Sequence, residues 1–380
     1  MRDDRLMVFR LALLVVFLFV GSAQGRTWRV EQDGSGEFVT IQPAVDAAAD
    51  GDTILIGAGW YQETNEYTNV PNMYGIVLAT AFWNDGRDLA IIGIGKESVV
   101  IGPPVYSDTG TFGVIAVNSS VSVRGVSFDK CRSGIRVVGN VNVDECHFSE
   151  SYVGVYIKGT TGAEIINCVF VNANNSDYGV IVRSSLNVNI NSCEFDDAGI
   201  YMEGTSGFFV EGSQFINSSY MFAPGSGGEV ANCEFVGGHF SVDGGHTVII
   251  RDSEFSGGSV NLSVSERNTV ALLYDNIFVG GEYYGLSLSG SASVIAEGNH
   301  FLLGESIYFV MTEYYPSYPY NIDLRNNYWG TSDAVEIEAM IFDSNDSTTE
   351  LAVVQYFPFS GVPLPSEPTS WGDLKAMYRE

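Results

Sequence analysis

Apolar and polar residues alternate in short runs along most of the chain, and each run ends close to an aromatic residue. This aromatic residue recurs at intervals of 20 to 28 residues. The ten positions are Phe128, Phe148, Phe170, Phe195, Phe215, Phe235, Phe255, Phe278, Phe301 and Trp329. A regular interval of this length indicates a repeat protein in which each unit stacks on the one before it.

The position five residues before the aromatic residue of each unit is apolar, and the position seven residues before it is mostly apolar. In the unit that ends at Phe148 they are Val143 and Val141, and Asn142 lies between them. In other units the intervening position holds Glu164, Asn189, Glu229 and Asp323. A period of two residues predicts a strand with one buried face. A second short alternating strand follows the aromatic residue, in segments such as GIRV, GVYI and GVIV.

Strands this short cannot form a stable sheet within one unit. If the units stack, every strand pairs in parallel with its counterpart in the next coil. We therefore predict an all-β fold, a parallel β-helix of about a dozen coils that lie about 4.8 Å apart. A β-propeller would need a period of roughly 40–50 residues, and leucine-rich repeats would need a regular leucine framework, which the sequence lacks.

A column of small or amide side chains is expected two residues before each aromatic residue. Its members are Cys146, Cys168, Cys193, Ser213, Cys233, Ser253, Asn276, Asn299 and Asn327. We expect this column to point inward at a bend, where asparagines hydrogen-bond their equivalents above and below and cysteines fill space as small apolar residues. A line of thiols does not converge on a zinc ion. A disulfide between Cys168 and Cys193 stays open, and Cys131 lies off the column.

Short helices are predicted to cover both ends of the coil stack, because an open sheet end invites pairing with another chain. The first follows Thr40, a candidate N-cap, and presents Ile41, Val45 and Ala48 on one face. The second begins after Asp333, with Glu336 three residues later in a capping-box pattern.

The pattern of the N-terminal residues is typical of a targeting segment. Three arginines precede or flank the apolar run 11–20, which is too short to span a bilayer. We predict a signal peptide over residues 1–25, the β-helix domain over 26–362, and a Pro-containing linker with a short tail over 363–380. The protein is then expected to be secreted, periplasmic or at the cell surface, with no membrane span in the mature chain.

The formal net charge of −28 changes the expected partners. Nucleic acid and anionic membrane surfaces both require cationic patches, so neither is expected as a partner. An anionic substrate would need a bridging cation.

Two terminal segments resemble a known family. Residues 33–63, DGSGEFVTIQPAVDAAADGDTILIGAGWYQE, resemble the opening of the pectin-lyase-like right-handed β-helix proteins, and especially of pectinesterases and bacterial β-helix repeat proteins. Residues 324–346 resemble the closing segment of the bacterial group. The resemblance implies a right-handed helix. The catalytic motifs of pectinesterases, polygalacturonases and pectate lyases are absent, so the resemblance does not carry their activities to this chain.

One column of carboxylates is a candidate calcium site. The position before the aromatic residue holds Glu194, Gln214, Glu234 and Glu254 in successive units. Stacked carboxylates repel one another and favour a cation, and Ca²⁺ prefers several oxygen ligands. The alternatives are a solvated acidic stripe and a carboxylate pair that acts as general acid and base.

Clustered tyrosines are the candidate glycan-binding residues. Tyr314, Tyr315 and Tyr318 lie in the longest interval of the repeat, and Tyr283 and Tyr284 lie in the unit before it. Extra residues in one coil form a loop beside the coil face, where solenoid proteins bind their ligands. Exposed rings stack on sugars, whereas covered rings pack on the coil beneath.

Three functions remain open from the sequence. The first is an exported, monomeric protein that binds a polysaccharide. The second is a polysaccharide lyase, esterase or hydrolase whose catalytic residues the motifs do not reveal. The third is a structural or adhesive surface module.

Overall fold

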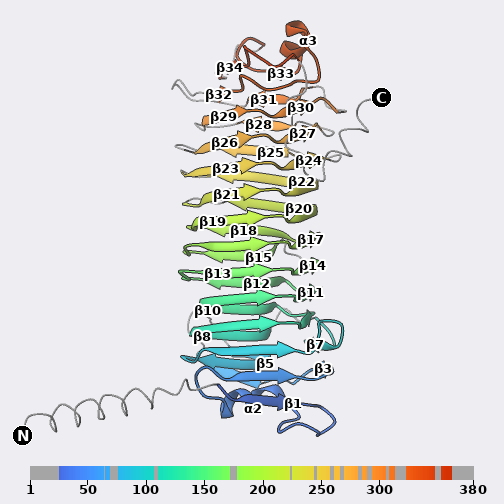
Figure 1. Ribbon diagram of the computed structural model, residues 1–380, viewed down its shortest axis with the longest axis vertical. Coiled ribbons are helices and arrows are strands. Elements are labelled where there is room, and N and C mark those ends of the chain that lie inside the picture. The colour runs from blue at the N-terminus through green and yellow to red at the C-terminus, as the bar shows by residue number, and fades with distance from the viewer. Residues whose placement is uncertain are drawn as a thin grey trace, which may run out of the picture.

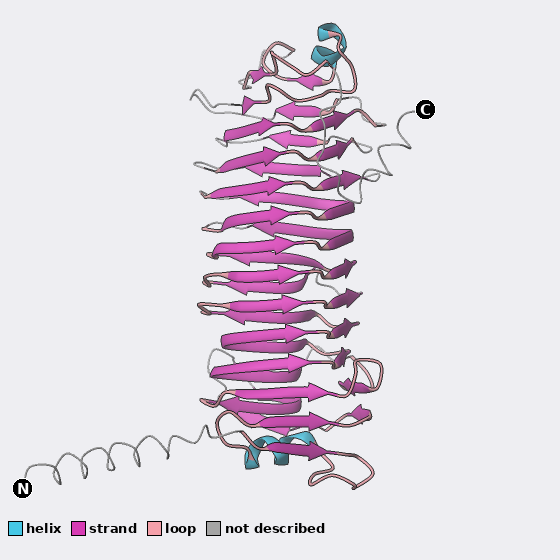
Figure 2. Cartoon of the chain, in the orientation of Figure 1, coloured by secondary structure: helices cyan, strands magenta, loops and turns pink. Residues whose placement is uncertain are grey.

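The computed structural model describes residues 25–63, 65–68, 76–106, 110–171, 178–222, 225–243, 246–256, 261–265, 269–280, 285–288, 293–304, 308–312, 322–346 and 352–361. These residues form one tall stack of about ten turns (Figure 1). Strands dominate the stack, and helices occur only near its two ends (Figure 2). The predicted parallel β-helix is confirmed.

Each coil contributes to three sheets, which we call sheets I, II and III. Sheet I contains β1 (Thr27–Val30), β2 (Thr53–Ile56), β6 (Leu89–Gly93), the second halves of β8 (Thr111–Arg124) and β10 (Ser133–Asp144), β13 (Ala163–Ile166), β16 (Val188–Asn191), β19 (Ser206–Glu211), β21 (Gly227–Ala231), β23 (Thr247–Arg251), β26 (Val270–Tyr274), β29 (Ser293–Glu297), β32 (Ile322–Asp323) and β34 (Val354–Gln355). Neighbouring strands pair in parallel throughout this sheet.

Sheet II holds the recurrent phenylalanines, from Phe128 to Phe301. It contains β3 (Gly59–Tyr61), β7 (Val99–Ile101), β9 (Ser127–Asp129), β11 (His147–Ser149), β14 (Val169–Val171), β17 (Glu194–Asp196), the first parts of β20 (Gln214–Phe222) and β22 (Glu234–Asp243), β24 (Glu254–Ser256), β27 (Ile277–Val279) and β30 (His300–Leu302).

Sheet III completes the coil. It contains β5 (Ile76–Asp85), the first halves of β8 and β10, β12 (Val153–Lys158), β15 (Tyr178–Arg183), β18 (Gly199–Glu203), the second parts of β20 and β22, β25 (Asn261–Ser265), β28 (Leu286–Leu288), β31 (Val310–Thr312) and β33 (Ile341–Phe342). The short strand β4 (Asn65–Thr68) pairs antiparallel with β5 and is an exception to the parallel pattern.

The recurrent phenylalanines form a continuous stack inside the helix. The rings of Phe170 and Phe195 lie 4.7 Å apart between centroids and within 5° of parallel. The rings from Phe128 to Phe278 all stack in this way, with centroids 4.6 to 5.2 Å apart and planes within 13° of parallel. Intervals of 20 to 25 residues in the sequence therefore become a nearly constant spacing along the axis, because each ring is in register with its neighbours.

Glycines at the start of the sheet III strands make room for these rings. A Cβ atom on Gly134 would lie 2.7 Å from Cδ1 of Phe148, and one on Gly154 would lie 2.6 Å from Cδ1 of Phe170. Real Cβ atoms do not approach so closely. The glycine that opens segments such as GIRV and GVYI is therefore required by packing.

The inward column before the aromatic residue is confirmed as well. Asn276 Nδ2 donates to Asn299 Oδ1 at 2.9 Å, and Asn299 Nδ2 donates to Asn327 Oδ1 at 2.9 Å. Each asparagine also donates to a buried main-chain carbonyl, as Asn299 does to Leu273 O at 2.8 Å. The ladder thus pairs main-chain groups that the bend would otherwise leave without partners.

The five cysteines are buried, and none forms a disulfide. Cys193 Sγ lies 3.3 Å from Asn191 O and 3.5 Å from Ile165 O. A hydrogen bond with the neighbouring thiol of Cys168, together with burial, raises the pKa of Cys193. These cysteines occupy the same slot as the asparagines and serve as small buried side chains.

Two helices close the described parts of the stack. Helix α2 (Ile41–Ala47) buries Ile41 and Val45, as the sequence pattern predicts, and also Ala44. The third predicted residue, Ala48, is buried at the C-cap. Thr40 at the N-cap makes no side-chain capping bond. Helix α3 (Ala334–Ala339) is capped by Asp333, whose Oδ1 accepts from Val335 N at 2.8 Å.

The expected capping box at α3 is wrong in one contact. The side chain of Glu336 accepts a hydrogen bond from Thr331 Oγ1 and does not reach back to Asp333. The main-chain N–H of Asp333 instead donates to Thr331 Oγ1 at 3.1 Å.

The predicted signal peptide and tail lie outside the described residues. Within the part of the chain that the structure describes, no helix combines the length and apolar character needed to span a bilayer.

Candidate functional site

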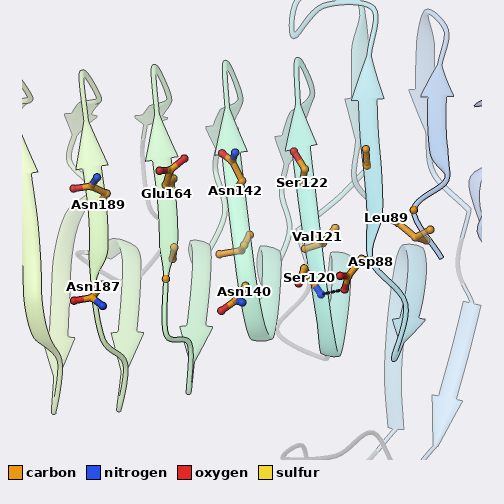
Figure 3. Close-up of a pocket in the computed structure, with 15 residues that line it drawn as sticks. Asp88, Leu89, Ser120, Val121, Ser122, Asn140, Asn142, Glu164, Asn187 and Asn189 are labelled. Carbon is orange, nitrogen blue, oxygen red and sulfur yellow. Dashed lines mark hydrogen bonds between the residues drawn. The ribbon is translucent and has the colours of Figure 1, made fainter. Parts of the chain in front are cut away.

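A shallow groove of about 550 Å³ runs along the outer face of sheet I. It crosses five neighbouring strand segments, from β6 to β16 (Figure 3). Because these strands run in parallel and in register, their outward side chains form straight rows along the helix axis.

Two rows of polar side chains line the groove (Figure 3). The first row comes from the strands themselves and contains Ser122, Asn142, Glu164 and Asn189. Register pairs Ser122 with Asn142, Asn142 with Glu164, and Glu164 with Asn189. The second row contains Asp88 and Asn187, which precede β6 and β16, and Ser120 and Asn140, which lie within β8 and β10.

Hydrogen bonds within the fold fix the second row. Asp88 Oδ1 accepts from Ser120 N at 2.8 Å, which joins two consecutive coils. Asn140 Oδ1 accepts from Thr160 Oγ1 at 2.8 Å. These contacts tie Asp88 and Asn140, two members of the row, to the neighbouring coils.

The first row, in contrast, offers its polar atoms to the outside. Asn142, Glu164 and Asn189 are exposed. Among the described residues, none of these three side chains has a hydrogen-bond partner within the protein. An amide, a carboxylate and an amide therefore point out of the sheet at successive coil spacings, available to a ligand.

The two carboxylates in the groove are too far apart to act together on one bond. Asp88 and Glu164 are separated by three coil steps, which is about 14 Å at about 4.8 Å per step. Paired carboxylates of glycoside hydrolases lie roughly 5–9.5 Å apart. Asp88 and Glu164 therefore do not form the acid–base pair of a glycoside hydrolase.

The predicted acidic column on sheet II is in register. Glu194 pairs with Gln214, Gln214 with Glu234, and Glu234 with Glu254. Gln214 Nε2 donates to Glu234 Oε2 at 2.8 Å, so an amide already separates two of the three carboxylates. Glu254 is only 7% exposed, whereas the sequence pattern predicted a side chain that faces solvent.

These carboxylates do not converge on one point. Among the described residues no group of three acidic, histidine or cysteine side chains is placed to hold a metal ion. A calcium ion shared by Glu234 and Glu254, the one directly paired couple, stays a prediction.

The predicted tyrosine site cannot be placed. Tyr283, Tyr284, Tyr314, Tyr315 and Tyr318 all lie outside the described residues. Their role in glycan binding stays a prediction from the sequence.

The sequence contains a signal for the groove that lies outside any known motif. The polar residue between two buried ones at Asn142, Glu164 and Asn189 indicated a half-exposed strand. Only the register shows that these polar positions are neighbours in one row.

The fold matches known proteins more clearly than the sequence does. Residues 110–237 match the family model of the right handed beta helix region. No curated protein sequence matches the chain. Among solved structures, a tailspike of Pseudomonas phage phi297 is similar over 75% of this chain and 72% of its own, with a TM-score of 0.51 and 12% identity.

A second solved structure has the same fold. The Agl-KA catalytic domain is similar over 84% of this chain and 64% of its own length, with a TM-score of 0.52 and 10% identity. This chain therefore spans somewhat less than two thirds of that domain. Identities this low show the fold alone. The chain is a right-handed parallel β-helix protein.

Proposed function

We propose that this protein is exported and binds a polysaccharide along the groove of sheet I. The observation that carries the proposal is the first row of the groove, in which Asn142, Glu164 and Asn189 project from consecutive coils without a partner in the described protein. The export part of the proposal comes from the N-terminal sequence alone.

The periodicity of the row suits a polymer. Coils repeat about every 4.8 Å, which is close to the length that one sugar residue adds to an extended glycan chain. Each amide side chain can donate and accept, as sugar hydroxyls do. A glycan lying along the axis would then meet an equivalent polar group at each residue.

The groove chemistry favours an uncharged ligand. Its lining contains the carboxylates of Asp88 and Glu164 and no lysine or arginine. An acidic sugar placed here would be repelled, since like charges at close range are unfavourable. The lining also contains no aromatic side chain. Hydrogen bonds to sugar hydroxyls, and not ring stacking, would therefore provide the affinity.

Replacing the first row tests the proposal. The triple variant Asn142→Ala, Glu164→Ala and Asn189→Ala should weaken binding of a neutral polysaccharide at least tenfold. Three hydrogen bonds at about 0.5–1.5 kcal/mol each support that figure. Affinity electrophoresis across a panel of neutral polysaccharides measures it.

Glu297→Ala provides the control. Glu297 is an exposed outward carboxylate on the same sheet, but it lies in β29, beyond the groove. Its loss should leave binding unchanged. If the triple variant binds the glycan as tightly as the wild type, or if no neutral polysaccharide binds, the groove is not the binding site.

The same samples should be assayed for new chain ends. Depolymerisation that Glu164→Gln abolishes would show that the protein is an enzyme and would overturn a purely binding role.

A further inference from the structure

The outer face of sheet I changes character beyond the groove. Within the groove the outward residues of the first row are polar, whereas three consecutive strands farther along the stack carry an aliphatic residue at the corresponding position. These strands are β23, β26 and β29, which are neighbours in the upper half of the stack (Figure 1). Their outward residues, which we call the apolar row, are Ile249, Leu272 and Ile295.

Register places the apolar row in one straight line. Ile249 pairs with Leu272, and Leu272 pairs with Ile295. The residues on either side of Ile249, which are Val248 and Ile250, are completely buried. Alternation along the strand therefore turns the row members outward, and Ile295 is 36% exposed. Apolar surface residues that stand singly need no explanation, but a contiguous strip indicates an interaction surface.

Carboxylates bound the apolar row at both ends. Glu229 pairs with Ile249 from the coil before it, and Asp323 pairs with Ile295 from the coil after it. Both carboxylates also contact an arginine of the same sheet. A strip about 10 Å long, from the first row member to the last, therefore lies between two acidic ends.

The chain itself carries a segment with a matching face. Residues 369–380, TSWGDLKAMYRE, lie outside the described residues, and we call them the C-terminal segment. In a helix, Trp371, Leu374 and Tyr378 would share one face, because they are spaced i, i+3 and i+7. The sequence thus pairs an aliphatic strip on sheet I with an amphipathic segment that has an apolar face of its own.

Such a helix needs a surface to pack on. Ser370 with Asp373 three residues later has the capping-box pattern, which predicts where the helix begins. Gly372 weakens the first turn, however, and isolated helices of this length are marginal in water. The C-terminal segment is therefore expected to be helical only where its apolar face is covered.

The spacing along the two elements agrees. Residues three or four apart in a helix lie about 4.5–6 Å apart along its axis, and the members of the apolar row lie about 4.8 Å apart. A helix parallel to the stack axis would therefore offer one apolar side chain to each coil. With Trp371 against Ile295, Leu374 would lie against Leu272.

The linker is long enough for this arrangement. The last described residue, Gly361, belongs to the coil of β34, which is two coil steps, about 10 Å, beyond β29. Nine residues, 362–370, separate Gly361 from Trp371. In an extended polyproline conformation they span about 28 Å. The C-terminal segment can thus reach the apolar row, and it approaches from the side of β29.

Charge favours the same direction. The N-terminus of a helix is stabilised by a nearby carboxylate, and Asp323 lies at the end of the row where the helix would begin. Glu229 lies at the other end, where the helix would bring Lys375 and Arg379. Opposite charges would therefore meet at both ends of the row.

We infer that the apolar row is the docking surface of the C-terminal segment, which binds it as a helix along the stack axis. This part of sheet I is then closed to other ligands, whereas the groove between β6 and β16 stays open. The inference does not rest on the proposed function, because it concerns a different part of the sheet and a different partner.

Two other occupants fit the observations less well. A second copy of this chain would need a larger surface, because stable interfaces bury about 800 Å² on each partner. It would also bring a further net charge of −28. A glycan would find neither hydrogen-bonding groups nor aromatic rings on three aliphatic side chains.

Hydrogen exchange followed by mass spectrometry tests the inference on the purified protein. The amides of residues 372–380 should exchange at least about tenfold more slowly than those of a synthetic peptide of residues 363–380. The double variant Leu272→Ser and Ile295→Ser should reduce this difference to below about threefold, because the row loses its apolar contacts. Slow exchange of the strand amides in β23, β26 and β29 would show that these coils are still folded.

Leu303→Ser is the matched control. Leu303 is 40% exposed, but it follows β30 of sheet II and is not part of the apolar row. Its loss removes an exposed aliphatic side chain of the same kind and should leave the exchange of the C-terminal segment unchanged.

A cross-linking experiment checks the direction of the helix. Leu272→Cys combined with Leu374→Cys should be joined within one chain by a short bis-maleimide, whereas Leu303→Cys combined with Leu374→Cys should not. The five native cysteines are buried, so the two introduced thiols react first.

Three results would overturn the inference. One is exchange of the C-terminal segment as fast as in the free peptide, and another is slow exchange that the double variant leaves unchanged. The third is slow exchange that disappears on dilution together with a dimer in sedimentation, which would identify a second copy as the occupant. None of these measurements involves a glycan, so failure of this inference leaves the proposed function intact.

Discussion

The stack of phenylalanines leads to a quantitative prediction about Phe195. Its side chain is completely buried between the rings of Phe170 and Phe215, each 4.7 Å away between centroids. Phe195→Ala removes the ring and leaves a cavity. The strands above and below are fixed by parallel pairing on both sides, so the cavity cannot close. We therefore expect the cost to lie in the upper part of the range of about 3–5 kcal/mol for such changes.

Cys193→Ser, two residues away, is the matched control. Serine already occupies the same column, where Ser213 Oγ donates to Glu211 O at 3.0 Å and Ser253 Oγ donates to Arg251 O at 2.9 Å. A serine at position 193 can make the equivalent bond to Asn191 O. Because the hydroxyl gains a partner, we expect a cost below about 1 kcal/mol.

Equilibrium urea unfolding followed by far-UV circular dichroism measures both variants. Repeat proteins can unfold in stages, so the shape of each transition should be compared as well as its midpoint. If Cys193→Ser lowers stability more than Phe195→Ala does, the assignment of the ring stack as the principal core is refuted.

Three further changes probe other parts of the structure. Gly154→Ala should destabilise the protein by about 1–3 kcal/mol, because the added Cβ would overlap the ring of Phe170. A melting temperature equal to that of the wild type would contradict this packing. Burial raises the pKa of Glu63 above its ordinary 4.5, so the folded state binds this proton more tightly than the unfolded state. The contribution of Glu63 to stability is then present below pH 4.5 and lost as pH rises through the folded pKa, and Glu63→Gln should flatten the stability–pH curve there. If Glu234 and Glu254 share Ca²⁺, adding the ion should raise the melting temperature, and replacing both residues by Gln should remove this increase. Equal melting temperatures in Ca²⁺ and in chelator would show that the column binds no calcium.

The repeat is the part of this protein that the sequence determines on its own. A buried position every second residue, an aromatic residue every 20 to 28 residues, and small or amide residues two positions before it are all local signals. A solenoid converts such signals directly into structure, because each coil contacts only its neighbours. For this reason the ring stack, the asparagine ladder and the buried cysteines could all be predicted without coordinates.

A further local signal in the sequence marks the bend between two sheets. The residue three before the aromatic adopts a positive φ in coil after coil, as at Asn167, Ser192 and Asp275. Asparagine and aspartate tolerate this conformation better than most residues. The composition of that position therefore marks the bend between sheets I and II.

The surfaces depended on tertiary structure. Asn142, Glu164 and Asn189 are separated by 22 and 25 residues in the sequence, and only pairing in register makes them one row. Ile249, Leu272 and Ile295 likewise form one row only because β23, β26 and β29 pair without a shift. An outward polar side chain costs little folding free energy at any outward position, so the pattern of buried residues does not constrain it. The alignment of the coils alone decides which side chains become its neighbours.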